Sequence, residues 1–201
     1  MFWCASEPAE GAIPVPAGEG RMHVAGGFGT LLPTFTLGGT LGVGDGVDLD
    51  LRYETYAALS HDISLTSRIS LAEYWAVALS LNHVFFLIED IGGVESADAP
   101  VGNGLSLAPS LFGSFFLDSG VHVALGASAS FRFIELVRNE DGTLTRQPRL
   151  TLAHAALRVA VEWEGDGATT FLRFSAVVPI QADFRVLGYL PHISFGRSFQ
   201  L

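Results

Sequence analysis

The segment VDLDLRYETY, residues 47–56, alternates apolar and charged side chains over most of its length. Its odd-numbered residues are Val, Leu, Leu and Tyr up to position 53, and its even-numbered residues up to position 54 are Asp, Asp, Arg and Glu. Successive side chains of a β-strand point to opposite faces, so the pattern predicts a strand with one apolar and one charged face. The segment DISLTSRISL, residues 62–71, predicts a second strand of this kind.

Alternation with period two continues from Gly20 to the C-terminus, and no convincing amphipathic helix is found. The predicted strands are 20–30, 34–43, 47–57, 62–71, 75–87, 104–117, 120–135, 148–163, 168–182 and 186–201. Short connections are predicted at 44–46, 72–74, 118–120 and 164–167, and long polar ones at 88–103 and 136–148. Short turns at one end and long loops at the other are typical of an outer-membrane barrel.

Composition separates a barrel that faces lipid from a soluble one. Mean hydropathy is +0.38, yet no run approaches the roughly 18 apolar residues of a membrane helix. The polar strand faces are rich in Gly, Ala and Ser, which suits a narrow lumen better than a hydrated surface. We therefore expect an all-β fold: a closed antiparallel up-and-down transmembrane β-barrel over residues 20–201, its last strand pairing with its first. Ten strands are favoured, eight are the alternative, and a soluble β-barrel around an apolar ligand is the alternative outside the membrane.

The charge of the chain argues against one class of partner. The formal net charge is −10, and all 11 basic residues are Arg. Nucleic-acid binding needs a basic face, so a nucleic-acid partner is not expected.

The first 19 residues, 1–19, are rich in Pro, Ala and Glu and predict a flexible N-terminal tail. The only cysteine is Cys4, so neither an internal disulfide nor a cysteine-based metal site is expected. The start MFWC fits the end of an export signal with a lipid-modified Cys, but a free cysteine in a flexible tail is the simpler interpretation.

Aromatic residues gather beside the short connections. Tyr74, Trp75, Phe116 and Trp163 each lie close to a predicted turn. Aromatic residues at the two rims are typical of membrane barrels, so these four predict an aromatic girdle at one membrane interface.

The C-terminal sequence SFGRSFQL, residues 194–201, resembles the assembly signal of bacterial outer-membrane β-barrel proteins. That signal has a polar residue, any residue, Gly, two residues of any kind, and a hydrophobic–any–hydrophobic ending. Ser194, Gly196, Phe199 and Leu201 occupy its fixed positions. The resemblance implies recognition by the barrel-assembly machinery and location in the outer membrane of a Gram-negative cell, and it identifies no subfamily.

Charged residues on the polar strand faces are expected to point into the lumen. Strands 47–57 and 62–71 pair around a turn near residue 59, which predicts Asp50 opposite Arg68. Because a buried charge needs a partner, such pairs either fill a narrow barrel or line a path for small solutes, and the first interpretation is favoured. The predicted lumen-facing network comprises Asp48, Asp50, Arg52, Glu54, Arg68, Asn82, Arg132, Arg158 and Arg173.

No residue set predicts catalysis, a metal site or a cofactor. His61 and Asp62 form a tempting pair near a predicted turn, but adjacent strand residues point to opposite faces. His154 and His192 match no triad or metal spacing. The acidic loop 88–103 is interpreted as a solvated loop.

The sequence therefore favours a small outer-membrane β-barrel with a non-catalytic role. That role is anchoring, envelope integrity, docking of a protein partner through loops 88–103 and 136–148, or a narrow channel. The alternatives are an outer-membrane lipid-modifying enzyme and the soluble barrel described above. Outer-membrane lipids and the assembly machinery are the expected partners.

Overall fold

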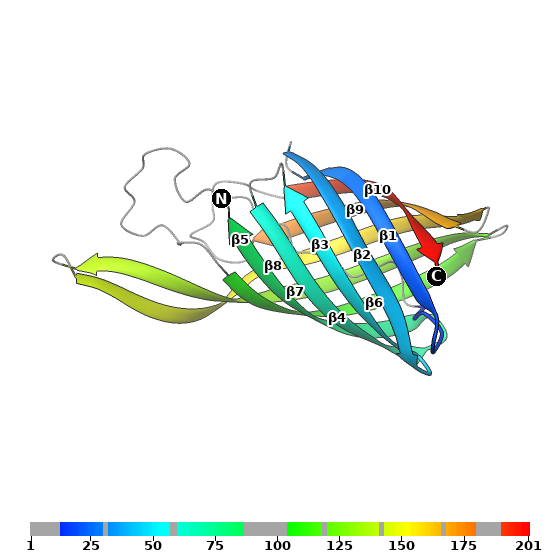
Figure 1. The fold of residues 1–201 in the computed structure, drawn as a ribbon, viewed down its shortest axis with the longest axis horizontal. Coiled ribbons are helices and arrows are strands. Elements are labelled where there is room, and N and C mark those ends of the chain that lie inside the picture. Colours follow the sequence, from blue (N-terminus) through cyan, green and yellow to red (C-terminus); the bar gives the residue numbers. More distant parts are fainter. Residues whose placement is uncertain are drawn as a thin grey trace.

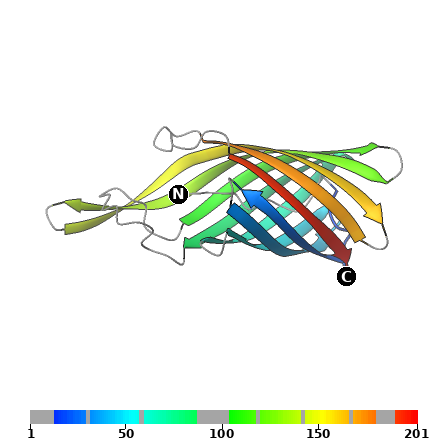
Figure 2. The same ribbon diagram turned by 90° about the horizontal axis from the view of Figure 1, so that it is seen from above.

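The structure is a computed structural model of the 201-residue chain. It describes residues 13–29, 32–56, 60–86, 104–117, 120–140, 143–165, 168–179 and 190–201. Ten antiparallel strands form a closed barrel in chain order, and β10 pairs with β1 (Figure 1, Figure 2). The strands are β1 Gly20–Gly29, β2 Leu32–Gly44, β3 Val47–Tyr56, β4 Ser60–Ala72, β5 Trp75–Phe86, β6 Gly104–Leu117, β7 Val121–Glu140, β8 Thr143–Gly165, β9 Ala168–Pro179 and β10 Leu190–Gln200. The predicted ten-stranded up-and-down barrel is confirmed.

At one end of the barrel, which we call the turn end, β2 is followed by β3, β4 by β5, β6 by β7 and β8 by β9, with two or three residues between the strands. Gly46 and Gly120 have φ angles of 72° and 78°, a left-handed conformation that glycine adopts without strain. The N–H of Leu201 donates to the carbonyl of Gly20 at 2.9 Å, so β1 begins and β10 ends at this end too. We call the opposite end the loop end.

The barrel wall is apolar outside and largely polar inside. Outward-facing Leu51, Leu65 and Leu79 expose 59%, 48% and 49% of their surface, whereas most inward-facing side chains are buried. Soluble proteins bury most large apolar side chains, so an apolar exterior of this extent suits a wall surrounded by lipid. Among the described residues, no helix has the length and apolar character needed to cross a bilayer.

β7 and β8 are longer than predicted. The prediction of a loop at 136–148 is wrong, because β7 continues to Glu140 and β8 begins at Thr143. An Asp-Gly pair separates these two residues in the sequence, and this dipeptide favours a tight hairpin. Beyond Phe133, β7 pairs only with β8 among the described strands, so the hairpin forms a two-stranded ribbon past the loop end (Figure 1). The second predicted docking loop, 88–103, lies outside the described residues.

Residues 13–19, which the sequence places in a flexible tail, are bonded to the barrel at its turn end. The N–H of Gly18 donates to the carbonyl of Gly42 at 2.9 Å. Val15 is 3% exposed, and its N–H donates to the carboxylate of Asp48 at 2.9 Å. A carbonyl of this segment fills the space that a side chain on Gly42 would need. The segment therefore covers the lumen at the turn end; the residues before it lie outside the described part of the chain.

Aromatic rings fill part of the lumen by lying on glycines of a neighbouring strand. Phe171 of β9 is fully buried opposite Gly196 of β10, where a methyl group would overlap the ring. Phe112 of β6 lies over Gly126 of β7 in the same way. Only a residue without a side chain leaves room for such a ring, so these pairs fix the contact between adjacent strands.

Candidate functional site in the barrel lumen

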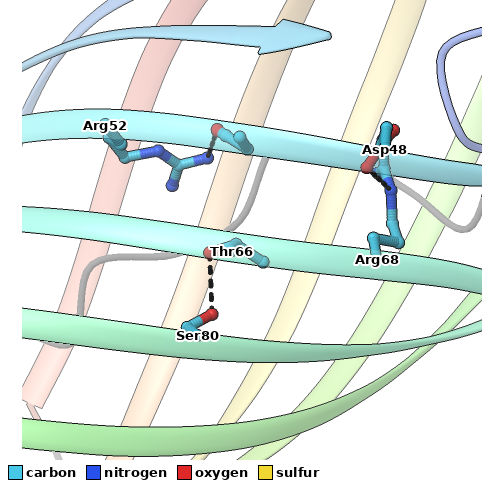
Figure 3. Close-up of polar contacts among 6 residues, drawn as sticks. Asp48, Arg52, Thr66, Arg68 and Ser80 are labelled. Carbon is cyan, nitrogen blue, oxygen red and sulfur yellow. Dashed lines mark hydrogen bonds and ion pairs between the residues drawn. The ribbon is translucent and has the colours of Figure 1, made fainter. Parts of the chain in front are cut away.

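A buried ion pair lies inside the lumen near the turn end, between β3 and β4. Arg68 lies opposite Asp48, and its guanidinium donates to both carboxylate oxygens, with Nε 3.2 Å from Oδ1 and Nη2 in a short contact with Oδ2 (Figure 3). Bidentate pairs of this kind are the strongest between charged side chains. The predicted pairing of Arg68 with Asp50 is wrong: Tyr56 pairs with Ser60, so the register differs by two residues from the predicted one.

Asp50 pairs instead with Arg52 of its own strand. Arg52 Nη2 lies 3.7 Å from Asp50 Oδ1, and both side chains are almost completely buried. One strand further, the hydroxyls of Thr66 and Ser80 are hydrogen-bonded at 2.8 Å across β4 and β5 (Figure 3). The Asp48–Arg68 ion pair therefore links β3 to β4 inside the barrel, and the Thr66–Ser80 contact links β4 to β5.

A second polar group lies closer to the loop end. Glu54 and Asp62 face each other across β3 and β4 and are 3% and 2% exposed. His192 of β10 has its Nε2 3.9 Å from Glu54 Oε1 and hydrogen-bonded at 3.1 Å to the hydroxyl of Thr34. Facing carboxylates repel each other, and the His192 ring lies beside one of them. This group links β10 to β2 and β3 across the closing seam.

On the side of the lumen formed by β8 and β9, the guanidiniums of Arg158 and Arg173 contact neutral groups. Arg158 Nη2 donates to the Ser128 hydroxyl at 3.2 Å, and the Arg173 guanidinium lies 5.3 Å from the ring centre of Phe171. The second contact is a cation–π interaction, which is stronger when it is shielded from water. The buried charged side chains among the described residues are Asp48, Asp50, Glu54, Asp62, Glu162, Arg52, Arg68, Arg158 and Arg173. Carboxylates and guanidiniums are thus nearly balanced in number.

Of the predicted lumen residues, only Arg132 has a side chain outside the described part of the chain. The others are inside the lumen and at most 6% exposed: Asp48, Asp50, Arg52, Glu54, Arg68, Asn82, Arg158 and Arg173. Asn82 donates from Nδ2 to the hydroxyl of Ser106 at 3.2 Å. Sequence reasoning missed His23 and Glu162, which are both 2% exposed. Strand parity was the available signal, since each occupies an inward position between outward-facing neighbours.

The arrangement of His61 and Asp62 does not favour a catalytic pair. Asp62 points into the lumen, whereas His61 stacks on Tyr53 at 5.7 Å between ring centres on the outer face, and a short hydrogen bond joins its Nδ1 and the Tyr53 hydroxyl. The side chain of His154 lies outside the described residues. Within the described ranges, no group of three or more His, Cys, Asp or Glu residues is arranged to hold a metal ion.

Aromatic pairs lie on the outer face toward the turn end. Trp75 packs edge-on against Phe115 with ring centres 6.4 Å apart, and Trp163 packs against Phe195 at 6.3 Å. All four rings expose more than a third of their surface. Amphipathic rings at this level are suited to a membrane interface.

Phe116 differs from the other members of the predicted girdle. It has the parity of the inward-facing residues of β6, and its ring stacks on His122 at 5.4 Å. Tyr74, in the β4–β5 turn, lies edge-on to Phe116 at 6.1 Å. The Tyr74 hydroxyl donates to the Glu73 carboxylate at 2.7 Å, and this hydrogen bond raises the pKa of Tyr74. The outer position beside Trp75 belongs to Phe115.

The C-terminal motif is divided between the two faces of β10. Phe199 and Leu201 are 42% and 75% exposed on the outer side. Ser194 is 2% exposed in the lumen, and Gly196 lies beneath the ring of Phe171. The apolar residues of the motif therefore face outward and its small residues face inward.

No protein-family model and no curated protein matches the sequence. Similar solved structures include the NanC porin, with 11% identity, a TM-score of 0.48, and coverage of 90% of this chain and 100% of that chain. An outer membrane channel from Pseudomonas putida F1 has 11% identity and a TM-score of 0.46, with coverage of 98% and 100%. The N-terminal β-barrel domain of Pseudomonas aeruginosa OprF has 10% identity and a TM-score of 0.41, with coverage of 92% and 98%. At this level the likeness concerns the barrel fold and carries no information about function.

Proposed function

We propose that this protein is a structural β-barrel of the Gram-negative outer membrane, with a closed lumen and an anchoring role. The observation that carries the proposal is the burial of polar side chains inside the barrel. Asp48, Arg52 and Asn82 are each 1% exposed. An open, water-filled lumen would leave such side chains accessible, as in porins, so side chains and residues 13–19 fill this one.

Three features support the membrane location. The outer wall is apolar, aromatic pairs lie toward its turn end, and the last residues resemble an outer-membrane assembly signal. A closed barrel of this kind contacts outer-membrane lipids throughout its life and the barrel-assembly machinery during biogenesis. An anchoring role needs no catalytic group, and the contacts inside the lumen stabilise the barrel.

Recordings in planar lipid bilayers test the closed lumen. The full chain is expected to insert without producing a steady current. Insertion is checked separately in lipid vesicles by the slower gel mobility of the heated, unfolded form, which distinguishes a closed barrel from one that never inserted. A stable, reproducible conductance in most insertions would replace the anchoring role with a narrow channel.

Docking of a protein partner is a second candidate, favoured by the β7–β8 ribbon. An isolated two-stranded ribbon is marginally stable in water, so a partner that covers it would stabilise it. Photocrosslinking in intact cells from positions 138 and 145, with position 65 on the barrel wall as the control, tests this role. A discrete protein adduct from the ribbon positions alone is expected; identical patterns from all three positions would contradict docking.

A further inference from the structure

Residues 13–19 are joined to the inside of the turn end at two places. The N–H of Gly18 donates to the carbonyl of Gly42 at 2.9 Å, and the N–H of Val15 donates to the carboxylate of Asp48 at 2.9 Å. Gly42 lies opposite Asp48 across β2 and β3, so both contacts are made at one pair of facing positions in the wall. We call this pair, Gly42 and Asp48, the seat of the segment.

Gly42 is the residue that makes room for this segment. The atoms nearest to a methyl group added at Gly42 all belong to the backbone of Val15 and Pro16, and they lie close enough to overlap it. Gly44, two positions along the same strand, differs, because a methyl group there would meet Val47 at 4.0 Å, an ordinary contact. The seat is therefore shaped for residues 15 and 16, and it depends on the absence of one side chain in the wall.

The segment is held more lightly than a strand of the barrel. Val15 is the only buried side chain within residues 13–19, and residues 16–18 are exposed. A segment with so few buried contacts opens locally at a smaller free energy than the whole protein unfolds, because ordering its backbone is costly. When Val15 leaves, Asp48 keeps both of its contacts with Arg68 (Figure 3). Release of the segment therefore leaves no buried charge without its partner.

Polar groups lie on the lumen side of the segment. Thr40 is the next inward-facing residue of β2 beyond Gly42, and Ser198 of β10 lies in the following row across the seam. Their side chains are 3% and 2% exposed, and neither hydroxyl has a hydrogen-bond partner among the described residues. A buried hydroxyl without a partner is costly, and contact with water removes that cost. Release of the segment would therefore hydrate groups that gain from it.

We propose that residues 13–19 are a displaceable plug at the turn end of the barrel. The segment leaves its seat while the strands stay paired, and water and small hydrophilic solutes then reach Thr40 and Asp48 from that end. Farther from the turn end the lumen stays filled, where Arg52 and Asn82 are each 1% exposed. The inference goes beyond the anchoring role, because a barrel with a closed lumen and a barrel with a narrow channel can both carry such a plug.

Thiol modification of the full chain in lipid nanodiscs, which leave both ends of the barrel open to solvent, tests the plug. The reporter is Thr40→Cys combined with Cys4→Ser, which removes the only natural cysteine, and the reagent is a small cationic methanethiosulfonate. Gly42→Ala displaces the segment and is expected to speed modification roughly tenfold, since overlap with one methyl group shifts the local equilibrium by about that factor. Gly44→Ala is the matched control in the same strand and should leave the rate unchanged.

Two results would overturn the proposal. They are equal rates in Gly42→Ala and Gly44→Ala, and modification of Thr40→Cys at the rate of the unfolded chain while the segment is unaltered. If Gly42→Ala does not give the heat-modifiable folded form, Val15→Asp replaces it, because it places a second carboxylate beside Asp48 and repels the segment from its own side.

A second reporter separates this proposal from the closed lumen. Ser64 faces the lumen farther from the turn end and is 2% exposed, so Ser64→Cys is expected to stay slow in Gly42→Ala. If both reporters speed up in Gly42→Ala and neither does in Gly44→Ala, the plug stands and the closed lumen of the anchoring role fails.

Discussion

The lumen is filled differently on its two sides. Between β3, β4 and β5, charged and hydroxyl side chains contact one another across the strands, as Asp48 and Arg68 do. On the side formed by strands β6 to β10, aromatic rings lie on glycines of the neighbouring strand, as Phe171 does on Gly196. The first side is held by electrostatic attraction and hydrogen bonds, and the second by shape.

The two kinds of filling differ in what they tolerate. An ion pair adapts to small movements because long side chains can follow each other, but it fails when one charge is removed. A ring that lies on a glycine is held by its fit and leaves no room for one added methyl group. Substitutions on each side should therefore reveal opposite sensitivities.

The largest effect is expected from Arg68→Met. It leaves the Asp48 carboxylate buried without its cation, which should lower the free energy of unfolding by about 3–5 kcal/mol. Urea titration in lipid vesicles measures the loss. Exchanging the charges, Asp48→Arg with Arg68→Asp, should restore part of it, whereas Asp50→Arg with Arg68→Asp should not. Rescue by the Asp50 exchange instead would mean that the register of β3 and β4 is wrong.

Val15→Pro comes next. It removes the N–H that donates to Asp48 at 2.9 Å, and losing a hydrogen bond to a buried charge should lower the free energy of unfolding by about 1.5–3 kcal/mol. Ala17→Pro is the control, because Glu19 N–H donates to Pro16 O at 3.0 Å and proline suits the second position of such a turn. Equal effects of the two substitutions would count against the bond to Asp48.

Gly196→Ala probes the side held by shape. The added methyl group overlaps both the ring of Phe171 and the backbone carbonyl of Val24, and crowding of this kind should lower the free energy of unfolding by about 1–3 kcal/mol. In a double-mutant cycle, Phe171→Leu should recover only the part of that loss that comes from the ring. Simple additivity of the two substitutions would show that Gly196 and Phe171 do not interact.

The smallest effect is expected from Thr66→Val. It removes the hydrogen bond to Ser80 at 2.8 Å, and the free energy of unfolding should fall by about 1 kcal/mol. Ser67→Val, the adjacent outward position, is the matched control and should leave stability within error. A larger loss in the control would contradict the assignment of the two faces of β4.

Much of the fold could be predicted because strand alternation is local. Most residues of 47–56 and 62–71 identify their own face by their polarity, so most inward charges could be found from the sequence. Pairing is not local. When the centre of the β3–β4 turn moves by one residue, the register changes by two, and Arg68 then lies opposite Asp48 instead of Asp50. Both aspartates face the lumen, so their polarity does not reveal this difference. The contact of Phe171 with Gly196 depends in the same way on the register of β9 and β10, and neither strand alone carries a sequence signal for it.

The closing seam has a consequence for how the barrel forms and lasts. β1 pairs with β10, and at its edge Gln200 donates to Glu19 at 3.0 Å, across 181 positions of the chain. Contacts so distant in sequence are formed slowly, because a long loop must be closed before they contribute. An assembly intermediate that lacks this seam has two unpaired strand edges, which hydrocarbon does not tolerate. The lifetime of the folded protein is then governed by the rate at which one pair of strands separates.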